Sequence, residues 1–172
     1  MSTPKNQDPT INKMPLTGRT LELADIEALA LGAWILGTGG GGDPYHKLLN
    51  MRELYKNGHT VELVDPMSLN DNALVAVLSN MGAPLVGQER LADPAFAIKP
   101  VRMMERYLGR AFDAVMALEI GGGNGVHPML VAALSGYPVI DADTMGRAYP
   151  EAQMTSVAVS NLQCFPLTLA DI

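Results

Sequence analysis

The stretch DAVMALEIGGGNGVHPMLVAALSGYPVIDAD, residues 113–143, contains the pattern that decides the fold. Residues 113–120 form an apolar run typical of a buried strand, 121–125 are a glycine loop, and 126–136 have a helical composition. Residues 138–143 predict a second strand. Strand, loop, helix and strand form a βαβ unit, whose parallel strands are covered on both faces. We therefore expect an α/β fold, a mostly parallel sheet with helices on both faces in a three-layer sandwich.

A second glycine-rich stretch, GTGGGG at 37–42, matches the dinucleotide-binding pattern G-x-G-x-x-G but lies in the wrong context. It follows a predicted helix over 23–36, whose N-cap we place at Thr20, whereas the dinucleotide motif follows a strand. Asp43 and Pro44 then predict the start of another helix, which ends at Gly58. No Lys-Ser or Lys-Thr pair follows either glycine run, so a P-loop is excluded and no nucleotide cofactor is expected.

The remaining pattern completes one domain over residues 19–172. Residues 60–65, 73–80 and the stretch from 155 onward predict strands, and residues 101–108 predict a helix. The first 18 residues are polar and contain proline, which predicts a mobile tail rather than a signal peptide. The apolar side chains of the last stretch need a partner surface, which predicts that the isolated chain either self-associates or is only marginally stable; they are Leu162, Phe165, Leu167 and Leu169.

Composition narrows the class of partner. The net charge of -6 argues against nucleic acid, because phosphate binding requires clustered Lys and Arg. No apolar run is long enough to cross a bilayer, so no membrane partner is expected. Cys164 is the single cysteine, which fits a reducing cytoplasm. A small molecule or another protein is the expected partner.

The two glycine runs are the candidate binding loops. Backbone N–H groups of residues 121–125 can bind an anion or polarise a carbonyl at the start of a helix, or the loop can simply allow close packing. GTGGGG can either cap a helix or bring backbone close to a ligand, and we expect it to lie beside the second loop. The candidate substrate-binding residues are Gly40, Gly41, Gly42, Asp43, Gly121, Gly122, Gly123 and Asn124.

Several ionisable residues lie near the same predicted sheet edge. Asp141 and Asp143 alternate along the predicted strand and so face the same side, as an acid and base pair or as solvated strand-end groups. His127 follows the second loop and is either an acid-base group, a metal ligand or a surface histidine. The metal candidates are His127, Asp141 and Asp143, and a divalent ion such as zinc is one option. Spacing alone does not establish such a site.

Four motifs in this order resemble the S-methyl-thiohydantoin desulfurase family, which is associated with hydantoinase and oxoprolinase-type proteins. They are LGTGGGGDPY at 36–45, NMGAP at 80–84, EIGGGNG at 119–125 and DADTMGRAYPEAQM at 141–154. The resemblance runs from about Thr20 to the C-terminus and corresponds to the family's N-terminal domain. A β-rich C-terminal domain is typical of the family, and we expect this chain to be a fragment or to have that half as a separate partner.

The resemblance implies hydrolysis at C2 of a hydantoin-type ring, with release of a thiol. Within that reading, Asp141, Asp143 and His127 are the catalytic candidates, Glu119 orients one of them, and Arg147 binds a substrate carboxylate. We expect the chain alone to be inactive. The alternatives are a non-catalytic subunit or scaffold domain of a hydantoinase-like assembly and, less in keeping with the motifs, a nucleotide-binding module.

Overall fold

The protein is described here from a computed structural model, which covers residues 17–82, 89 and 93–171. The expected N-terminal tail lies largely outside these residues, since only its last two positions are described. At the C-terminal end of that predicted tail the backbone enters a strand that the sequence analysis missed, β1, Gly18–Leu21.

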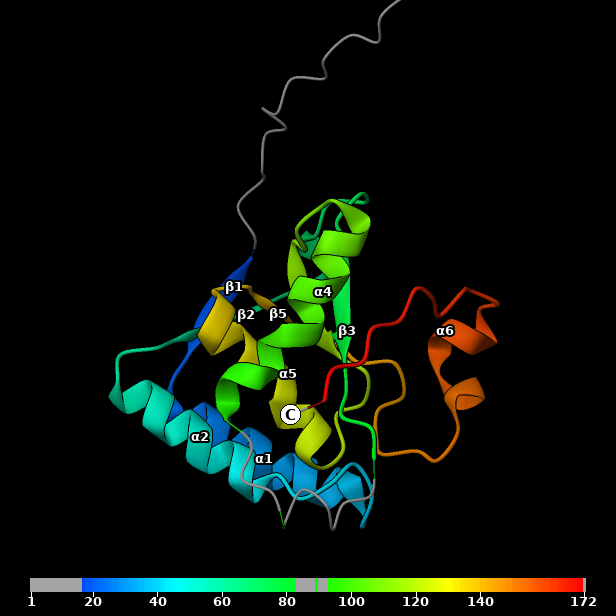
Figure 1. Cartoon of the computed structure of the whole chain (residues 1–172). Coiled ribbons are helices and arrows are strands. Elements are labelled where there is room, and N and C mark those ends of the chain that lie inside the picture. The colour runs from blue at the N-terminus through cyan, green and yellow to red at the C-terminus, as the bar shows by residue number, and fades with distance from the viewer. Residues whose placement is uncertain (1–16, 83–88, 90–92, 172) are drawn as a thin grey trace, which may run out of the picture.

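The centre of the fold is a five-stranded sheet (Figure 1). Its strands are β1, β2 (Val61–Val64), β3 (Val75–Leu78), β4 (Ala114–Ala117) and β5 (Val139–Ile140), in the order β1-β2-β5-β4-β3. β1 pairs with β2 in antiparallel orientation, and the other three pairings are parallel. The expected α/β class with a mostly parallel sheet is confirmed, and the arrangement is consistent with a three-layer α/β sandwich.

Four helices lie where the sequence predicts them, and one short helix lies in the stretch predicted as the C-terminal strand. Among residues 17–82, 89 and 93–171 the helices are α1 (Leu23–Gly37), α2 (Tyr45–Lys56), α4 (Lys99–Leu108), α5 (Gly123–Ser135) and α6 (Ser156–Val159), with short 3-10 turns at Pro66–Ser68, Pro94–Ile98 and Ala152–Met154. α5 is the central helix, because it packs against α1, α2 and β4 together (Figure 1). Each of its residues from Gly123 to Ala133 is buried.

The core has two unequal parts. The main cluster joins the helices to one face of the sheet, with Ile26, Met51 and Val126 fully buried within it. On the other face, Val64, Ala114 and Ile140 form a smaller cluster against Leu69 and partly buried neighbours. At roughly 25 cal/mol per Å² of apolar surface, the larger cluster supplies most of the burial energy. It therefore fixes α5, whose first turn carries the candidate site.

Two local expectations are wrong. Thr20 lies in β1 and does not cap α1; the N-cap is Glu22, in a capping box in which Asp25 Oδ2 accepts from the backbone N–H of Glu22 at 2.8 Å. In the C-terminal stretch, described to residue 171, there is no strand. Residues 156–159 form α6 instead, and Thr155 Oγ1 accepts from the N–H of Ala158 at its start.

The apolar side chains near the C-terminus are exposed. Leu162, Phe165, Leu167 and Leu169 each expose between 64% and 69% of their surface. The alternation there does not form a strand in this structure, because alternation favours a strand only where the segment also pairs with another strand, and pairing cannot be read from a local pattern. A partner surface for these residues remains a prediction. No helix among residues 17–82, 89 and 93–171 has the length and apolar character needed to span a membrane.

Candidate functional site

The two glycine loops lie against each other at the start of α5. Gly123 N donates to Gly42 O at 2.8 Å, and Asn124 N donates to Gly41 O at 3.2 Å. Gly122 N donates to Ala33 O, near the end of α1, at 2.6 Å. The expectation that GTGGGG lies beside the second loop is therefore confirmed. Because these first N–H groups of α5 already donate within the protein, they are not free to bind a ligand in this structure.

The close approach explains why both loops need glycine. A Cβ atom on Gly41 would lie 2.2 Å from Gly121 O, and one on Gly122 would lie 2.5 Å from Gly40 O. Gly41 also has a φ of +73° and Gly122 a φ of +65°, which residues with a side chain rarely adopt. At these positions the backbone of one glycine loop approaches the backbone of the other. That a ligand also contacts these loops stays a prediction.

Glu119 is buried at the centre of this junction, with 5% of its surface exposed. Its Oε1 accepts from Asn124 Nδ2 at 2.6 Å, and its Oε2 accepts from Tyr149 N at 3.0 Å. The amide oxygen of Asn124 in turn accepts from Asn80 N at 2.9 Å. Glu119 thus joins the end of β4, the first turn of α5 and the 143–149 segment. In this structure Glu119 positions these backbones, and the expectation that it orients a catalytic group stays a prediction.

Asp143 connects the segment that follows β5 to the second loop through hydrogen bonds. Its Oδ2 accepts from Ile120 N at 2.8 Å, and its two oxygens accept from Gly146 N at 2.8 and 2.9 Å. Thr144 Oγ1 donates to Leu118 O at 2.6 Å nearby. β5 ends at Ile140, so Asp141 and Asp143 lie beyond the strand, and strand alternation does not determine their directions. The carboxylate of Asp143 is occupied by backbone donors.

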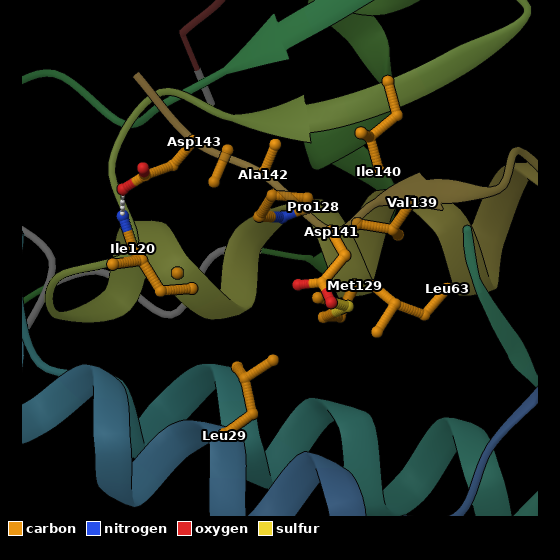
Figure 2. Close-up of a pocket in the computed structure, with 12 residues that line it drawn as sticks. Leu29, Leu63, Ile120, Pro128, Met129, Val139, Ile140, Asp141, Ala142 and Asp143 are labelled. Carbon is orange, nitrogen blue, oxygen red and sulfur yellow. Dashed lines mark hydrogen bonds between the residues drawn. The ribbon is translucent and has the colours of Figure 1, made fainter. Parts of the chain in front are cut away.

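A pocket of about 210 Å³ opens at the carboxyl ends of β4 and β5 (Figure 2). Asp141 points into it toward α1, whereas Asp143 points away toward Ile120 (Figure 2). Within the described part of the chain, the Asp141 carboxylate accepts no hydrogen bond. The walls are mostly apolar, and the lining residues are Leu29, Leu63, Ala117, Ile120, Gly125, Pro128, Met129, Val139, Ile140, Asp141, Ala142 and Asp143.

His127 does not line that pocket. Gly125, Pro128 and Met129 face it, and His127 follows Gly123 by one turn on a different side of α5. Its ring is buried, and its Nδ1 atom has no hydrogen-bond partner. Burial, with a smaller contribution from the charge of Lys47, lowers the pKa of His127 to about 3. The imidazole is therefore neutral at pH 7.

Lys47, which the sequence analysis did not select, lies beside this histidine. A Cβ on Gly123 would lie 2.9 Å from Lys47 Nζ, so the ammonium group occupies the space over the second loop. Burial lowers the pKa of Lys47 to about 8, and the charge of Asp43 opposes this effect. A lysine in the first turn of a helix has no distinctive sequence signal. Its position five residues after Gly42, the last glycine of GTGGGG, was the one available indication.

The structure separates the predicted ionisable residues. Asp141 and Asp143 lie at the pocket, His127 lies near Lys47, and Arg147 is exposed and donates to Ala148 O at 2.6 Å. Among residues 17–82, 89 and 93–171, no group of three or more His, Cys, Asp or Glu side chains converges to hold a metal. A metal held jointly by His127, Asp141 and Asp143 therefore remains a prediction, which elemental analysis of the purified protein would test.

Comparisons with known proteins agree with this architecture. The family model described as "S-Me-THD-like, N-terminal domain" matches residues 24–172. A crystal structure of a protein from Chromobacterium violaceum, a structural-genomics target, is similar with 30% sequence identity and a TM-score of 0.66. The match covers 83% of this chain and 40% of that protein, so the chain spans less than half of its length. No curated protein matches the sequence significantly. The chain belongs to the S-Me-THD-like family, and it matches that family's N-terminal domain.

Proposed function

We propose that this domain provides a pocket and a catalytic base for hydrolysis at C2 of an S-methyl-thiohydantoin or a related hydantoin-type ring. Membership of the S-Me-THD-like family supports the class of substrate. The pocket at the carboxyl ends of β4 and β5 supports the place, because ligands of open α/β sheets bind at that edge. The alternative is a non-catalytic domain of a hydantoinase-like assembly.

Asp141 is the proposed base. Of the two carboxylates at the pocket, Asp143 is occupied by backbone N–H donors, whereas Asp141 accepts no hydrogen bond from the residues described. A free carboxylate directed into a pocket can take a proton from a water molecule as its oxygen attacks the ring. This difference between Asp141 and Asp143 is the observation that carries the proposal.

The reaction balances with one water molecule. The water oxygen forms a bond with C2, and the bond between C2 and sulfur breaks, leaving a ring carbonyl and methanethiol. Of the two protons of the water, one ends on the ring nitrogen and one on the sulfur, and Asp141 carries protons between these atoms. No oxidant or reductant is required.

The shape of the pocket fits a small, uncharged ring. Leu29, Leu63 and Met129 supply apolar surface for the ring and its methylthio group. The volume of about 210 Å³ is below the range of roughly 300–1,000 Å³ that holds drug-sized ligands and cofactors. A compact five-membered ring is therefore favoured over a dinucleotide.

The test is methanethiol release from an S-methyl-thiohydantoin, followed with a thiol reagent. It is run with the purified chain and with the chain supplemented by a protein that provides the rest of the family length. We expect Asp141→Asn to lower kcat/KM by roughly 10²–10⁴-fold, the usual contribution of a general base. Asp71→Asn, a matched change in an exposed turn before β3, leaves the rate unchanged.

Two outcomes contradict the proposal. If neither preparation releases thiol, the domain has no part in this reaction. If thiol is released at the same rate with Asp141→Asn, the base lies elsewhere and the non-catalytic alternative is favoured.

A further inference from the structure

Lys47 holds a positive charge over the second glycine loop, and Asp43 is the acidic group whose charge acts on it. The side chain of Lys47 is half-buried. If residue 123 had a Cβ atom, that atom would lie 2.9 Å from Lys47 Nζ. In the described part of the chain, Lys47 forms neither a hydrogen bond nor an ion pair. The nearby Asp43 carboxylate accepts instead from Tyr45 N at 2.8 Å. An ammonium group held close to protein backbone in this way is costly unless something pairs with it.

His127 supplies a second unpaired group on the same side of α5. Gly123 and His127 are four residues apart and therefore share one face of the helix, the face over which Lys47 lies. Only 6% of the histidine surface is exposed, and Nδ1 has no hydrogen-bond partner. Buried polar atoms in native proteins are nearly always paired, so an unpaired ring nitrogen on the helix face that Lys47 covers offers a second donor for a ligand.

The local field is positive. The N-terminal end of α5 carries the positive end of the helix dipole, and Lys47 adds a full charge beside it. The effect of Lys47 on His127 is repulsive, since its charge lowers the pKa of the histidine. Asp43 is the acidic group whose charge acts on Lys47, and its carboxylate is already bound to backbone. That hydrogen bond leaves the negative charge of Asp43 in place, so Lys47 and the helix dipole attract an anion against the opposing charge of Asp43.

We propose that Lys47 and His127 bind a small carboxylate at the start of α5, on a different side of the helix from the Asp141 pocket. One carboxylate oxygen accepts from the ammonium group of Lys47. The other accepts from Nδ1–H of the neutral His127 ring. Because this site shares no residue with the lining of the Asp141 pocket, it does not depend on the proposed hydrolysis.

The donors present favour a carboxylate over a phosphate. A phosphate needs several donors, which glycine loops usually supply through consecutive backbone N–H groups. Here the N–H groups of Gly122, Gly123 and Asn124 donate to carbonyl oxygens of Ala33 and the first loop. One ammonium and one imidazole N–H remain, and these match the two oxygens and single charge of a carboxylate.

The test uses acetate as the probe, titrated into the isotopically labelled chain while the His127 ring signals are followed by NMR. We expect a saturable shift of these signals, at least tenfold weaker binding in Lys47→Met, and binding within about threefold of the wild type in Lys47→Arg. Lys56→Met is the matched control on the same helix. Lys56 is exposed and pairs only at 3.8 Å with Glu53, so its loss leaves binding unchanged.

Three results overturn the proposal. They are the absence of a saturable shift, equal acetate affinity in the wild type and Lys47→Met, and tighter binding of inorganic phosphate than of acetate. Each variant is first checked by far-UV circular dichroism. Lys47→Arg keeps the positive charge, and Lys47→Met removes it. If only one of the two variants folds, its acetate affinity compared with that of the wild type still tests the proposal.

Discussion

Replacing Gly41 by alanine removes the space that lets the two glycine loops touch. The new Cβ would lie 2.2 Å from Gly121 O, a backbone atom that has no freedom to rotate away. Gly42 provides a matched control one residue along. It has nearly the same φ, +78° against +73°, but a Cβ there meets no atom within 4 Å.

The difference between the two variants isolates the contact between the loops. Both lose the favourable left-handed conformation of glycine, at a cost of about 1–2 kcal/mol. In Gly41→Ala the loops must also separate, which breaks the hydrogen bond from Asn124 N to Gly41 O. Leaving one buried backbone group unpaired costs about 1–3 kcal/mol more. We therefore expect Gly41→Ala to be destabilised by about 2 kcal/mol more than Gly42→Ala.

Thermal unfolding followed by circular dichroism measures this difference. For a domain of this size, 1 kcal/mol corresponds to about 2–4 °C in Tm, so the two variants should differ by roughly 4–8 °C. Equal Tm values for Gly41→Ala and Gly42→Ala would refute the reasoning, because they would show that the loops do not need to touch.

Three further predictions concern single positions. Gly32→Ala, in the interior of α1 where a Cβ meets no atom within 4 Å, should stabilise the protein by about 1 kcal/mol in denaturant titrations. Glu119→Gln should destabilise it by about 1–3 kcal/mol, because the amide cannot accept from both Asn124 Nδ2 and Tyr149 N without turning a donor toward one of them. In the folded protein the pKa of His127 is about 3, whereas in the unfolded chain the histidine takes up a proton near pH 6.5. The free energy of unfolding should therefore fall as the pH decreases from 6.5 toward 3, by at most about 1.4 kcal/mol per pH unit. His127→Gln should flatten that pH dependence.

The sequence predicted the parts of the fold that have a strong local pattern. The βαβ unit over residues 113–143 has long apolar runs and a glycine loop at the strand end, and the structure contains β4, α5 and β5 there. β1 was missed because three of its four residues are exposed, so its sequence has no apolar alternation. Pairing with β2 defines that strand, and pairing between distant segments is not visible in a local pattern.

The candidate site was predictable only in part. The number of glycines indicated that another group approaches the backbone of each loop closely. In the structure, that group is the backbone of the other glycine loop. The directions of Asp141 and Asp143 could not be read from strand alternation, because β5 ends before both of them. Lys47 could not be found, because its position over Gly123 depends on how α2 packs against α5.

The most direct test of the proposed function is hydrolysis of an S-methyl-thiohydantoin in water enriched in ¹⁸O, analysed by mass spectrometry. The assay uses the chain together with a protein that supplies the rest of the family length, and compares the wild type with Asp141→Asn. We predict one ¹⁸O atom in the ring product, one methanethiol for each product formed, and loss of both in Asp141→Asn. A product without the label, or labelled product formed equally fast by the Asp141→Asn variant, would contradict the assignment of this pocket to water attack at C2.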